Sequence, residues 1–516
     1  MRRTFIALTT VAAAFGVFYS AGCSNLADDC TENLRPPCYP ATSAGAGGDG
    51  GGGGTPVGCV PSENADPVAD ECGVFVSSSM GNDMNGGTKD KPFKTIGAAL
   101  TAANGKPVYA CAEAFTEAVV VSTPVDLYGG LDCSNGWAYV GAATKTTLTA
   151  AADTIPLVMQ AGGSGSRVED FAVIAVDAVT PGGSSIAVIA QDGATVELLR
   201  CELRAGAGAP GAAGTTPMDV GPNGEGQNGE NGMPGTDGEC ISAIAQTGGN
   251  GGQLTCDGMD VSGGLGGTGT AANSGGPGGN GQPQPGPMPP DGKGGKEQDA
   301  TQCAAGAGGA EGPPGPTGIG ATGIGDINAA GYTAVNGSAG IGAGTPGQGG
   351  GGGGGAKKCM NNNAGPSGGG GGSAGCGGAP GQGGGAGGSS IGLLSHQAAV
   401  TLTSVAIVTA LGGAGGLGGN GQPGGAGGQP GTGGGAGACT GGQGGAGGRG
   451  GSGGGGLGGH SIGIASKGTA PVQNDVTIVQ GAHGPGGLGG DGDMAAQGAD
   501  GQECKTLSFD EPGSCS

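Results

Sequence analysis

The sequence predicts an all-β chain, in which short strands stack as the coils of a solenoid and long glycine-rich loops leave the coils along one edge. Glycine contributes 137 of 516 residues and recurs in Gly-Gly-X triplets. Between the triplet runs, short stretches rich in Val and Ile return, bounded by turn residues, as is typical of strands. A repeat with a constant core and variable spacing indicates a fixed coil with variable loops.

The glycine runs have a period of three residues. In one run, glycine occupies Gly412, Gly415, Gly418, Gly421, Gly424 and Gly427. This is the period of an extended left-handed helix without internal hydrogen bonds. Collagen is excluded, because it needs one strict register and roughly 15–20% proline, whereas proline contributes 32 of the 516 residues here. We expect polyglycine II-like packing, in which neighbouring backbones exchange N–H···O and Cα–H···O bonds; the alternative is a disordered linker.

Residues 1–22 are predicted to be a lipoprotein signal peptide. Arg2 and Arg3 precede an apolar stretch, 5–18, that is too short to span a bilayer. The sequence Ser20-Ala21-Gly22-Cys23 resembles a bacterial lipobox, although Ser20 stands where leucine is usual. The resemblance implies that Cys23 is lipidated and that the lipid bilayer is a partner. An ordinary signal peptide, cleaved near the same place, is the alternative.

The lipobox resemblance also implies an exported protein that is held in the cell envelope by acyl chains. Ser24 after the lipidated cysteine is compatible with the outer membrane of a Gram-negative bacterium. No later stretch is long and apolar enough to cross a membrane, so we expect the lipid to be the only anchor; several acyl chains bind stably. Residues 23–58 lack apolar periodicity and are predicted to be a flexible tether.

The charge and the cysteine content argue against nucleic-acid binding and against a metal or cofactor site. The formal net charge is −22, and loss of Arg2 and Arg3 makes it −24. Such a chain repels phosphate backbones, so nucleic acid is not an expected partner. The 16 cysteines are free to pair outside the cytosol. Lipidation of Cys23 leaves an odd number, so at least one thiol stays free or pairs between chains. No Cys-x-x-Cys occurs and the three histidines are scattered, so neither a metal nor a cofactor is predicted.

Residues 59–140 hold most aromatic residues outside the signal peptide, and we expect the best-packed conventional core there. A pattern begins with Phe75-Val76-Ser77, continues through Gly81-Asn82-Asp83 and Lys91-Pro92-Phe93, and ends in a helical Gly97-Ala98-Ala99-Leu100. It resembles the N-terminal entry of right-handed parallel β-helices of the pectate-lyase-like superfamily, most of all secreted glycine-rich, PGRS-like lipoproteins. The resemblance implies an N-terminal capping helix and first strands near 108–111, 118–121 and 125–130. An unrelated small α+β domain is the alternative.

Further coils are expected at 141–205 and, alternating with glycine-rich loops, at 206–500. The first group has strand-like runs at 155–159, 171–176, 186–190 and 196–203. In the second group, Ile391 matches Ile462 and 415–419 matches 486–490, both at an offset of 71. At an offset of 55, 187–191 matches 242–246. Residues 318–335 are a weaker candidate for a coil, and 501–516 are predicted to be a C-terminal tail.

Cys201 and Cys256 correspond to each other at the offset of 55. If they occupy equivalent positions on adjacent coils, about 4.8 Å apart, they lie within the range of a disulfide. The hypothesis is therefore that these two residues are neighbours, with a possible disulfide between them.

The sequence supplies no catalytic residue that we would assign. Polysaccharide-cleaving β-helices use clustered acidic residues with Ca²⁺ or a basic residue; the candidates here are Glu169, Asp170, Asp177, Glu197, Arg200, Glu202 and Arg204. The last four, Glu197, Arg200, Glu202 and Arg204, alternate with Leu198, Leu199 and Leu203, which is typical of a solvated strand face. The stretch 486–491 resembles one turn of a calcium-binding nonapeptide repeat, but this motif works in tandem arrays, and calcium is not predicted.

These features predict a lipid-anchored cell-envelope or surface protein with a structural or adhesive role and without catalysis. Surface glycans and other cell-surface proteins are the candidate partners. The first alternative is a carbohydrate-binding or polysaccharide-cleaving β-helix protein, which the superfamily resemblance suggests. A groove lined by carboxylates and basic residues would favour it. The second alternative is binding of ice or another solid surface, which needs a flat face with regularly spaced small apolar residues.

Overall fold

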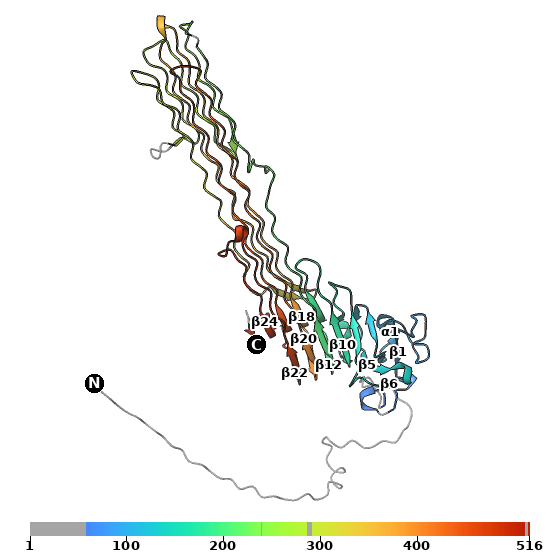
Figure 1. Ribbon diagram of the computed structural model, residues 1–516. Coiled ribbons are helices and arrows are strands. Elements are labelled where there is room, and N and C mark those ends of the chain that lie inside the picture. The colour runs from blue at the N-terminus through green and yellow to red at the C-terminus, as the bar shows by residue number, and fades with distance from the viewer. Residues whose placement is uncertain (1–57, 65, 239, 286–290, 511–513) are drawn as a thin grey trace, which may run out of the picture. The chain divides into compact units, whose positions relative to one another are not determined.

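The computed structural model describes residues 58–64, 66–238, 240–285, 291–510 and 514–516. The described chain is mostly β, with parallel sheets and one α-helix (Figure 1). The predicted signal peptide, the lipidation site Cys23 and nearly all of the predicted tether lie outside the described residues. Within the described residues, none of the helices has the length and apolar character needed to cross a membrane.

Three sheets contain nearly all strands. The first comprises β1 (Val74–Val76), β2 (Val108–Cys111), β5 (Asp126–Asp132), β6 (Ala138–Tyr139), β9 (Ser166–Glu169), β12 (Thr195–Leu199), β19 (Ala399–Thr403) and β22 (Val472–Asn474). The second comprises β3 (Ala114–Thr116), β7 (Thr146–Thr149), β10 (Phe171–Ala175), β13 (Glu202–Ala205), β20 (Ala406–Val408) and β23 (Thr477–Val479). The third comprises β4 (Val119–Val121), β8 (Leu157–Met159), β11 (Ser185–Ala190), β18 (Ser390–His396), β21 (Ser461–Lys467), β24 (Glu503–Ser508) and β25 (Ser514–Cys515).

The chain visits the three sheets in turn, and we call each passage through all three sheets a winding. It passes through β2–β3–β4, β5–β7–β8, β9–β10–β11, β12–β13–β18, β19–β20–β21 and β22–β23–β24. Neighbours within each sheet are parallel, apart from β5–β6 and β24–β25. Ile391 pairs with Ile462, and Ile407 pairs with Ile478, as the offset of 71 predicts. The strands expected at 108–111, 118–121 and 125–130 correspond to β2, β4 and β5.

The α-helix, α1 (Ile96–Ala103), covers the first winding. The side chain of Thr95 accepts the N–H of Ala98 and so begins the helix, and Asn104 in the left-handed region ends it. The carboxylate of Glu117 accepts the N–H groups of Ile96 and Gly97 at 2.8 and 3.0 Å, which favours a helix N-terminus. The helix contacts β1, β2 and β4. The predicted helix is therefore present.

The largest hydrophobic cluster lies between the sheets and runs from α1 to the last windings. It includes Ile96, Leu127, Leu198, Leu402 and Ile464, each at most 1% exposed. A separate cluster packs aromatic rings and two disulfides outside the first sheet; its rings belong to Phe75, Tyr109, Tyr128 and Trp137. Residues 59–140, where the best-packed core was expected, contribute to both clusters. The aromatic rings are there, but stacked aliphatic side chains extend the core along every winding.

The outer face of the third sheet is also buried. A hairpin, β16 (Asp326–Asn328) with β17 (Gly331–Thr333), inserts Ile327 into a cluster with Ile391, Ile462 and Leu507. The coil expected at 318–335 is therefore this antiparallel hairpin. Residues 503–508, expected in the C-terminal tail, form β24 and extend the third sheet instead. Short 3-10 turns lie at Pro61–Glu63, Asp70–Cys72, Cys133–Asn135, Ala161–Gly163, Met360–Asn362 and Gly490–Gly492.

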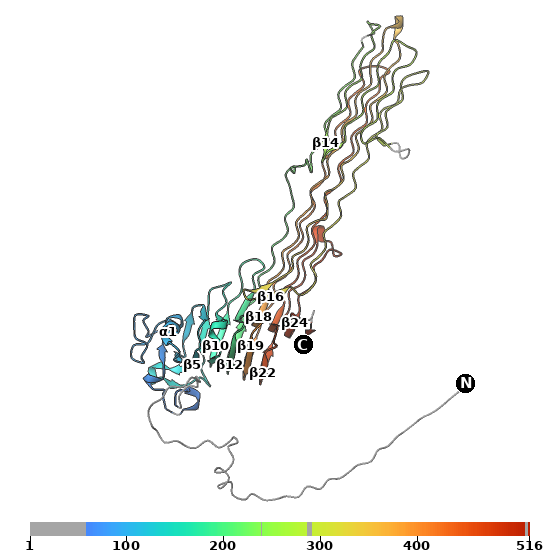
Figure 2. The same ribbon diagram turned by 180° about the vertical axis from the view of Figure 1, so that it is seen from behind.

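Three glycine-rich inserts leave the windings at the same point, after a strand of the second sheet and before a strand of the third. The first insert (206–389) joins β13 to β18, the second (409–460) joins β20 to β21, and the third (480–502) joins β23 to β24. Figure 1 shows their runs side by side, and the view from behind in Figure 2 agrees. The coil expected at 242–246 lies in the first insert and is not part of the three sheets, so this five-residue match does not mark a coil.

Backbone hydrogen bonds join these runs in three directions. The N–H groups of 368, 369 and 370 donate to the carbonyl oxygens of Gly267, Cys439 and Met233, in that order. The next three N–H groups, 371 to 373, donate to the carbonyl oxygens of Gly264, Gly442 and Glu230, which lie on the same three runs. These distances are 2.8 to 3.0 Å. Consecutive residues therefore bind three different runs, and the cycle repeats every third residue. A Cβ on Gly370 would overlap the carbonyl oxygen of Asn250, so this approach requires glycine.

Candidate functional site

Two acidic residues predicted as candidates, Glu169 and Asp170, gather around Arg200. Asp170 follows β9 and Arg200 follows β12, and both have a left-handed backbone (φ 58° and 51°). Because β9 and β12 pair in register, these two corners stack on adjacent windings. The Arg200 guanidinium contacts Glu169 and lies 2.9 Å from Oδ2 of Asp170.

Further polar groups close this cluster. Ser62 donates to Oε1 of Glu169, Arg167 lies 3.1 Å from its Oε2, and the hydroxyl of Tyr139 donates to Asp170 at 2.8 Å. Both carboxylates are only 1% exposed. Burial and the bond to Asp170 raise the pKa of Tyr139 to about 12. Burial alone would lower the pKa of Arg200, but the bond to Asp170 and the charge of Glu169 raise it above its ordinary value.

This arrangement is suited to holding two windings together. A carboxylate that acts as acid, base or nucleophile must reach the reacting atom directly or through one water, and these two are surrounded by side chains of the protein itself. Removing one partner of a buried ion pair strongly destabilises the folded protein, because the other charge stays buried without compensation. The cluster therefore has the features of a structural ion pair.

Of the other candidates, Glu197 reaches only the edge of this cluster, through Arg167, and Asp177, Glu202 and Arg204 make contacts elsewhere. Glu197 lies 3.9 Å from Arg167. Glu202 contacts Arg204, whose side chain is 54% exposed. Asp177 accepts the N–H of Ala207 at 2.7 Å, where the first insert begins. Glu197, Glu202 and Arg204 lie on a solvated strand face, as their alternation predicts, and Asp177 lies in a loop. Arg200 belongs to the same alternation but pairs with the two buried carboxylates.

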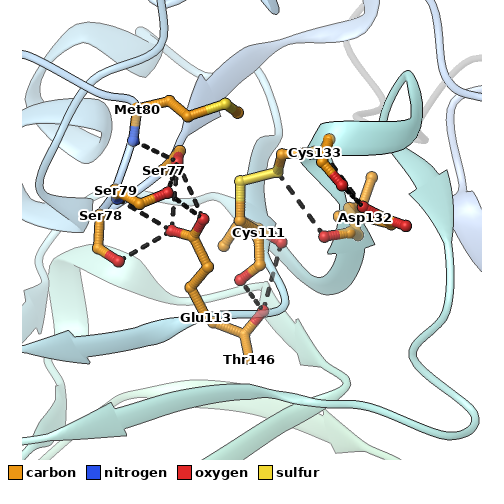
Figure 3. Close-up of a disulfide and its surroundings, with 12 residues drawn as sticks. Ser77, Ser78, Ser79, Met80, Cys111, Glu113, Asp132, Cys133 and Thr146 are labelled. Atoms are coloured by element: carbon orange, nitrogen blue, oxygen red, sulfur yellow. Dashed lines mark hydrogen bonds between the residues drawn. A yellow bond between two sulfur atoms is a disulfide. The ribbon is translucent and has the colours of Figure 1, made fainter.

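A further acidic residue, Glu113, was not singled out from the sequence; it lines a pocket of about 340 Å³. Figure 3 shows its carboxylate facing three serines. Its carboxylate accepts the hydroxyls of Ser78 and Ser79 at 2.8 and 2.6 Å and the N–H of Ser79 at 3.1 Å. The hydroxyl of Ser77 adds bonds of 3.2 and 3.3 Å. We call this set of hydrogen bonds from Ser77, Ser78 and Ser79 the Glu113 clasp. In the sequence, its only trace is the run of three serines directly after β1.

Hydrogen bonding governs the chemistry of Glu113. Burial raises the pKa of its carboxyl, but the bonds from Ser79, Ser78 and Ser77 outweigh burial and lower the pKa below its ordinary value. A general base works best with a pKa near the working pH, so this shift is in the wrong direction. The disulfide Cys111–Cys133 borders the same pocket and fixes its wall.

The predicted pairing of Cys201 with Cys256 was wrong. Cys256 bonds to Cys376, with Cα atoms 5.4 Å apart, and Cys201 is a free, buried thiol between the sheets. The reason is that Cys256 lies in a hairpin of the first insert, β14 (Thr255–Cys256) with β15 (Met259–Asp260), and not on a winding. The other disulfides of the described chain are Cys59–Cys72, Cys111–Cys133, Cys240–Cys359, Cys303–Cys439 and Cys504–Cys515.

Among the described residues, no three His, Cys, Asp or Glu side chains form a group that could hold a metal ion. His396 pairs with Asp192, and His483 lies 3.1 Å from Glu503. Asp491, in the stretch that resembles a calcium repeat, lies 2.8 Å from Arg449.

Comparison of the chain with protein families, with curated proteins and with solved structures found no match.

Proposed function

We propose that this protein is a lipid-anchored cell-envelope protein with a structural or adhesive role, in which a right-handed parallel β-helix carries a polyglycine II bundle. The ordered visits to three parallel sheets support the β-helix. The observation that carries the proposal is the three-directional hydrogen bonding of the inserts, because it ties otherwise flexible glycine runs to one another through their backbones.

The bundle supplies the contact surface. Its outer side chains are mostly small and uncharged, and large apolar groups stand out on it; Ile241, Ile244 and Met360 are 75%, 75% and 89% exposed. These three lie beside the disulfide Cys240–Cys359, which holds two distant parts of the first insert together. A pre-ordered surface loses less entropy on binding than a flexible one, and this property suits adhesion.

The chemistry of the carboxylates favours this role over polysaccharide cleavage. Glu113, Glu169 and Asp170 are engaged by serine, arginine and tyrosine side chains. A catalytic pair would need two carboxyl groups facing a shared substrate, with separations set by the reaction.

Two measurements test the proposal. Labelling with a radioactive fatty acid should mark the wild type but not Cys23→Ala, and equal labelling would remove the anchor at Cys23. The bundle is tested in cells that carry Gly370→Val, whose side chain would overlap Asn250, with Gly308→Ala as matched control; the nearest atom to a Cβ at 308 is 3.7 Å away. Attachment of cells to solid or glycan-coated surfaces should fall for Gly370→Val alone. Unchanged attachment at equal surface amounts would contradict the adhesive role.

A further inference from the structure

Two turns of the first insert are fixed to each other at the outer end of the bundle. One contains the short helical turn Met360–Asn362, which lies at the end furthest from the sheets (Figure 1). The disulfide Cys240–Cys359 joins it to a second turn, and the N–H of Ala364 donates to the carbonyl oxygen of Ser242 at 2.8 Å. Segments that are far apart in the sequence therefore form one structure at this end.

The two turns present large apolar side chains to solvent. Ile241 and Ile244 are each 75% exposed, and Met360 is 89% exposed. Ala243 and Ala245 are exposed as well. We call these five residues the apolar tip. Because the disulfide Cys240–Cys359 directly precedes both Ile241 and Met360 in the chain, it holds the two parts of the apolar tip next to each other.

Polar groups around the apolar tip bind within the protein. The hydroxyl of Ser242 accepts the N–H of Ile244 at 3.1 Å. The carbonyl oxygen of Ile244 accepts the side-chain amide of Gln246 at 3.0 Å, and that of Cys240 accepts the side-chain amide of Asn363. A polar group that leaves water without a partner costs free energy. These bonds therefore lower the cost of moving the apolar tip into an apolar medium.

The formal charges beside the apolar tip balance. Asp237 and Glu239 precede one turn in the sequence, and Lys357 and Lys358 precede the other. The whole chain has a formal net charge of −22. This end of the bundle can therefore approach an acidic surface with less repulsion than the rest of the molecule.

The size of the apolar tip favours a bilayer over a protein as its partner. A stable protein interface takes about 20–30 residues from each side, with matched shapes, whereas the apolar tip consists of five residues on two turns. Binding of a bilayer requires no matched shape, and its strength scales with the apolar area that becomes buried. A few exposed apolar side chains at the end of a bundle meet this requirement.

We infer that the apolar tip inserts into the interfacial region of a lipid bilayer. The inference rests on the proposed adhesive role and names a lipid surface as the partner. A single myristoyl chain binds bilayers with an association constant of about 10⁴ M⁻¹. Since the apolar tip buries no more than such a chain, we expect one molecule to bind no more tightly than about this value. Many molecules on one cell would then attach it through multivalency.

Flotation with phosphatidylcholine vesicles tests the inference on full-length protein that carries Cys23→Ala, so that no acyl chain contributes. In this background, Ile241→Ser combined with Ile244→Ser should lower the partition coefficient about tenfold or more, because most of the buried apolar area is lost. Ile319→Ser combined with Ile341→Ser is the matched control, since these residues are 67% and 66% exposed elsewhere on the bundle. Its binding should stay within about twofold of the parent. Absence of vesicle binding, or an equal loss in both variants, would overturn the inference.

Hydrogen exchange provides a second readout. Vesicles should slow exchange at 240–246 and 359–364 and leave 316–341 unchanged; the opposite pattern would also contradict insertion of the apolar tip. Both double variants should unfold at the temperature of the parent, because the replaced side chains are exposed, so a loss of binding cannot be attributed to unfolding.

The adhesive role and the lipid partner can fail separately. If attachment of cells falls with Ile241→Ser and Ile244→Ser while the parent protein does not bind vesicles, the adhesive role stands and the lipid inference is overturned. If the apolar tip binds vesicles but attachment of cells is unchanged by Gly370→Val, the lipid inference stands and the adhesive role is contradicted.

Discussion

Ile391 and Ile462 lie side by side in register in the third sheet, although the second glycine-rich insert separates them in the chain. Both are fully buried beneath the hairpin β16–β17. The same register continues into the inserts, where Gly415 and Gly418 donate to the carbonyl oxygens of Pro485 and Leu488. The strands and the glycine runs of successive windings are thus aligned by the same offset of 71 residues.

Gly370→Ala should lower the free energy of unfolding by about 1–3 kcal/mol, because an added methyl overlaps the carbonyl of Asn250 in a close-packed region. Gly308→Ala is the matched control. Its Cβ would meet nothing closer than 3.7 Å, so the change should be within about 1 kcal/mol of the wild type. Chemical denaturation measures both. Equal midpoints for the two variants would contradict the close approach of the runs.

Acidification should destabilise the protein through His460. This residue is fully buried; its Nδ1 accepts the N–H of Gln502 at 2.9 Å, and its Nε2 donates to the carbonyl of Ile324 at 3.0 Å. Burial lowers the pKa of this histidine in the folded state. The unfolded chain therefore binds a proton first as the pH falls below about 6.5, and stability declines by about 1.4 kcal/mol for each unit of pKa difference.

Melting temperatures between pH 8 and pH 5 measure this effect. His460→Gln keeps one donor and one acceptor but does not titrate, so its melting temperature should fall less over the same range. A wild-type profile that is parallel to that of His460→Gln would assign the acid sensitivity to other groups.

Replacement of Arg200 by methionine should cost about 3–5 kcal/mol, because it leaves the buried carboxylates of Glu169 and Asp170 without their shared cation. Arg204→Met is the control, since its ion pair with Glu202 is exposed and worth at most about 1 kcal/mol. Denaturant titrations of the two variants would give similar midpoints if the cluster were a surface feature.

Removal of the disulfide Cys303–Cys439 by a double serine substitution should loosen the bundle while leaving the windings in place. The bond closes a loop with a sequence separation of 136 residues, and loss of a native disulfide typically costs about 2–5 kcal/mol. Hydrogen exchange should accelerate in 292–310 and 435–450 and stay unchanged in β18 and β21. Faster exchange throughout the three sheets would indicate that bundle and windings unfold together.

Cys201 should be unreactive in the folded protein. Its thiol is buried between the sheets, and burial raises its pKa to about 12, so little nucleophilic thiolate forms at neutral pH. Maleimide treatment followed by peptide mapping should find Cys201 unmodified under native conditions and modified in denaturant without reductant. Rapid native labelling would place the thiol at the surface.

Strand positions such as 186–190 could be predicted from the sequence because β-branched stretches are bounded there by turn residues. The pairing of Ile391 with Ile462 was also predictable, since both the apolar core and the glycine rows repeat. Residues 242–246 misled the alignment, because a short match to 187–191 carries little information. The apolar core beyond residue 140, with Leu148, Phe171 and Leu198, lies in or near the stretches that the sequence marks as strands.

The contacts that make the candidate sites could not be predicted. The Glu113 clasp depends on the turn that brings Ser77 to Ser79 onto its carboxylate. Cys256 finds Cys376 at a sequence separation of 120 residues, because separate runs of the first insert lie side by side. A period of three residues indicates that runs can pack, but it does not determine which runs become neighbours.

The shared departure point of the three inserts, between the second and third sheets, has a consequence for how such a chain can change over time. Each insert runs outward and then back, so the chain re-enters the sheets close to where it left them. The length of an insert can therefore change without changing the winding to which it is attached. Duplication or loss of an out-and-back pair would resize the bundle while the Val- and Ile-rich register stayed intact. Bundle dimensions can therefore diverge rapidly between related chains whose sheets remain superimposable.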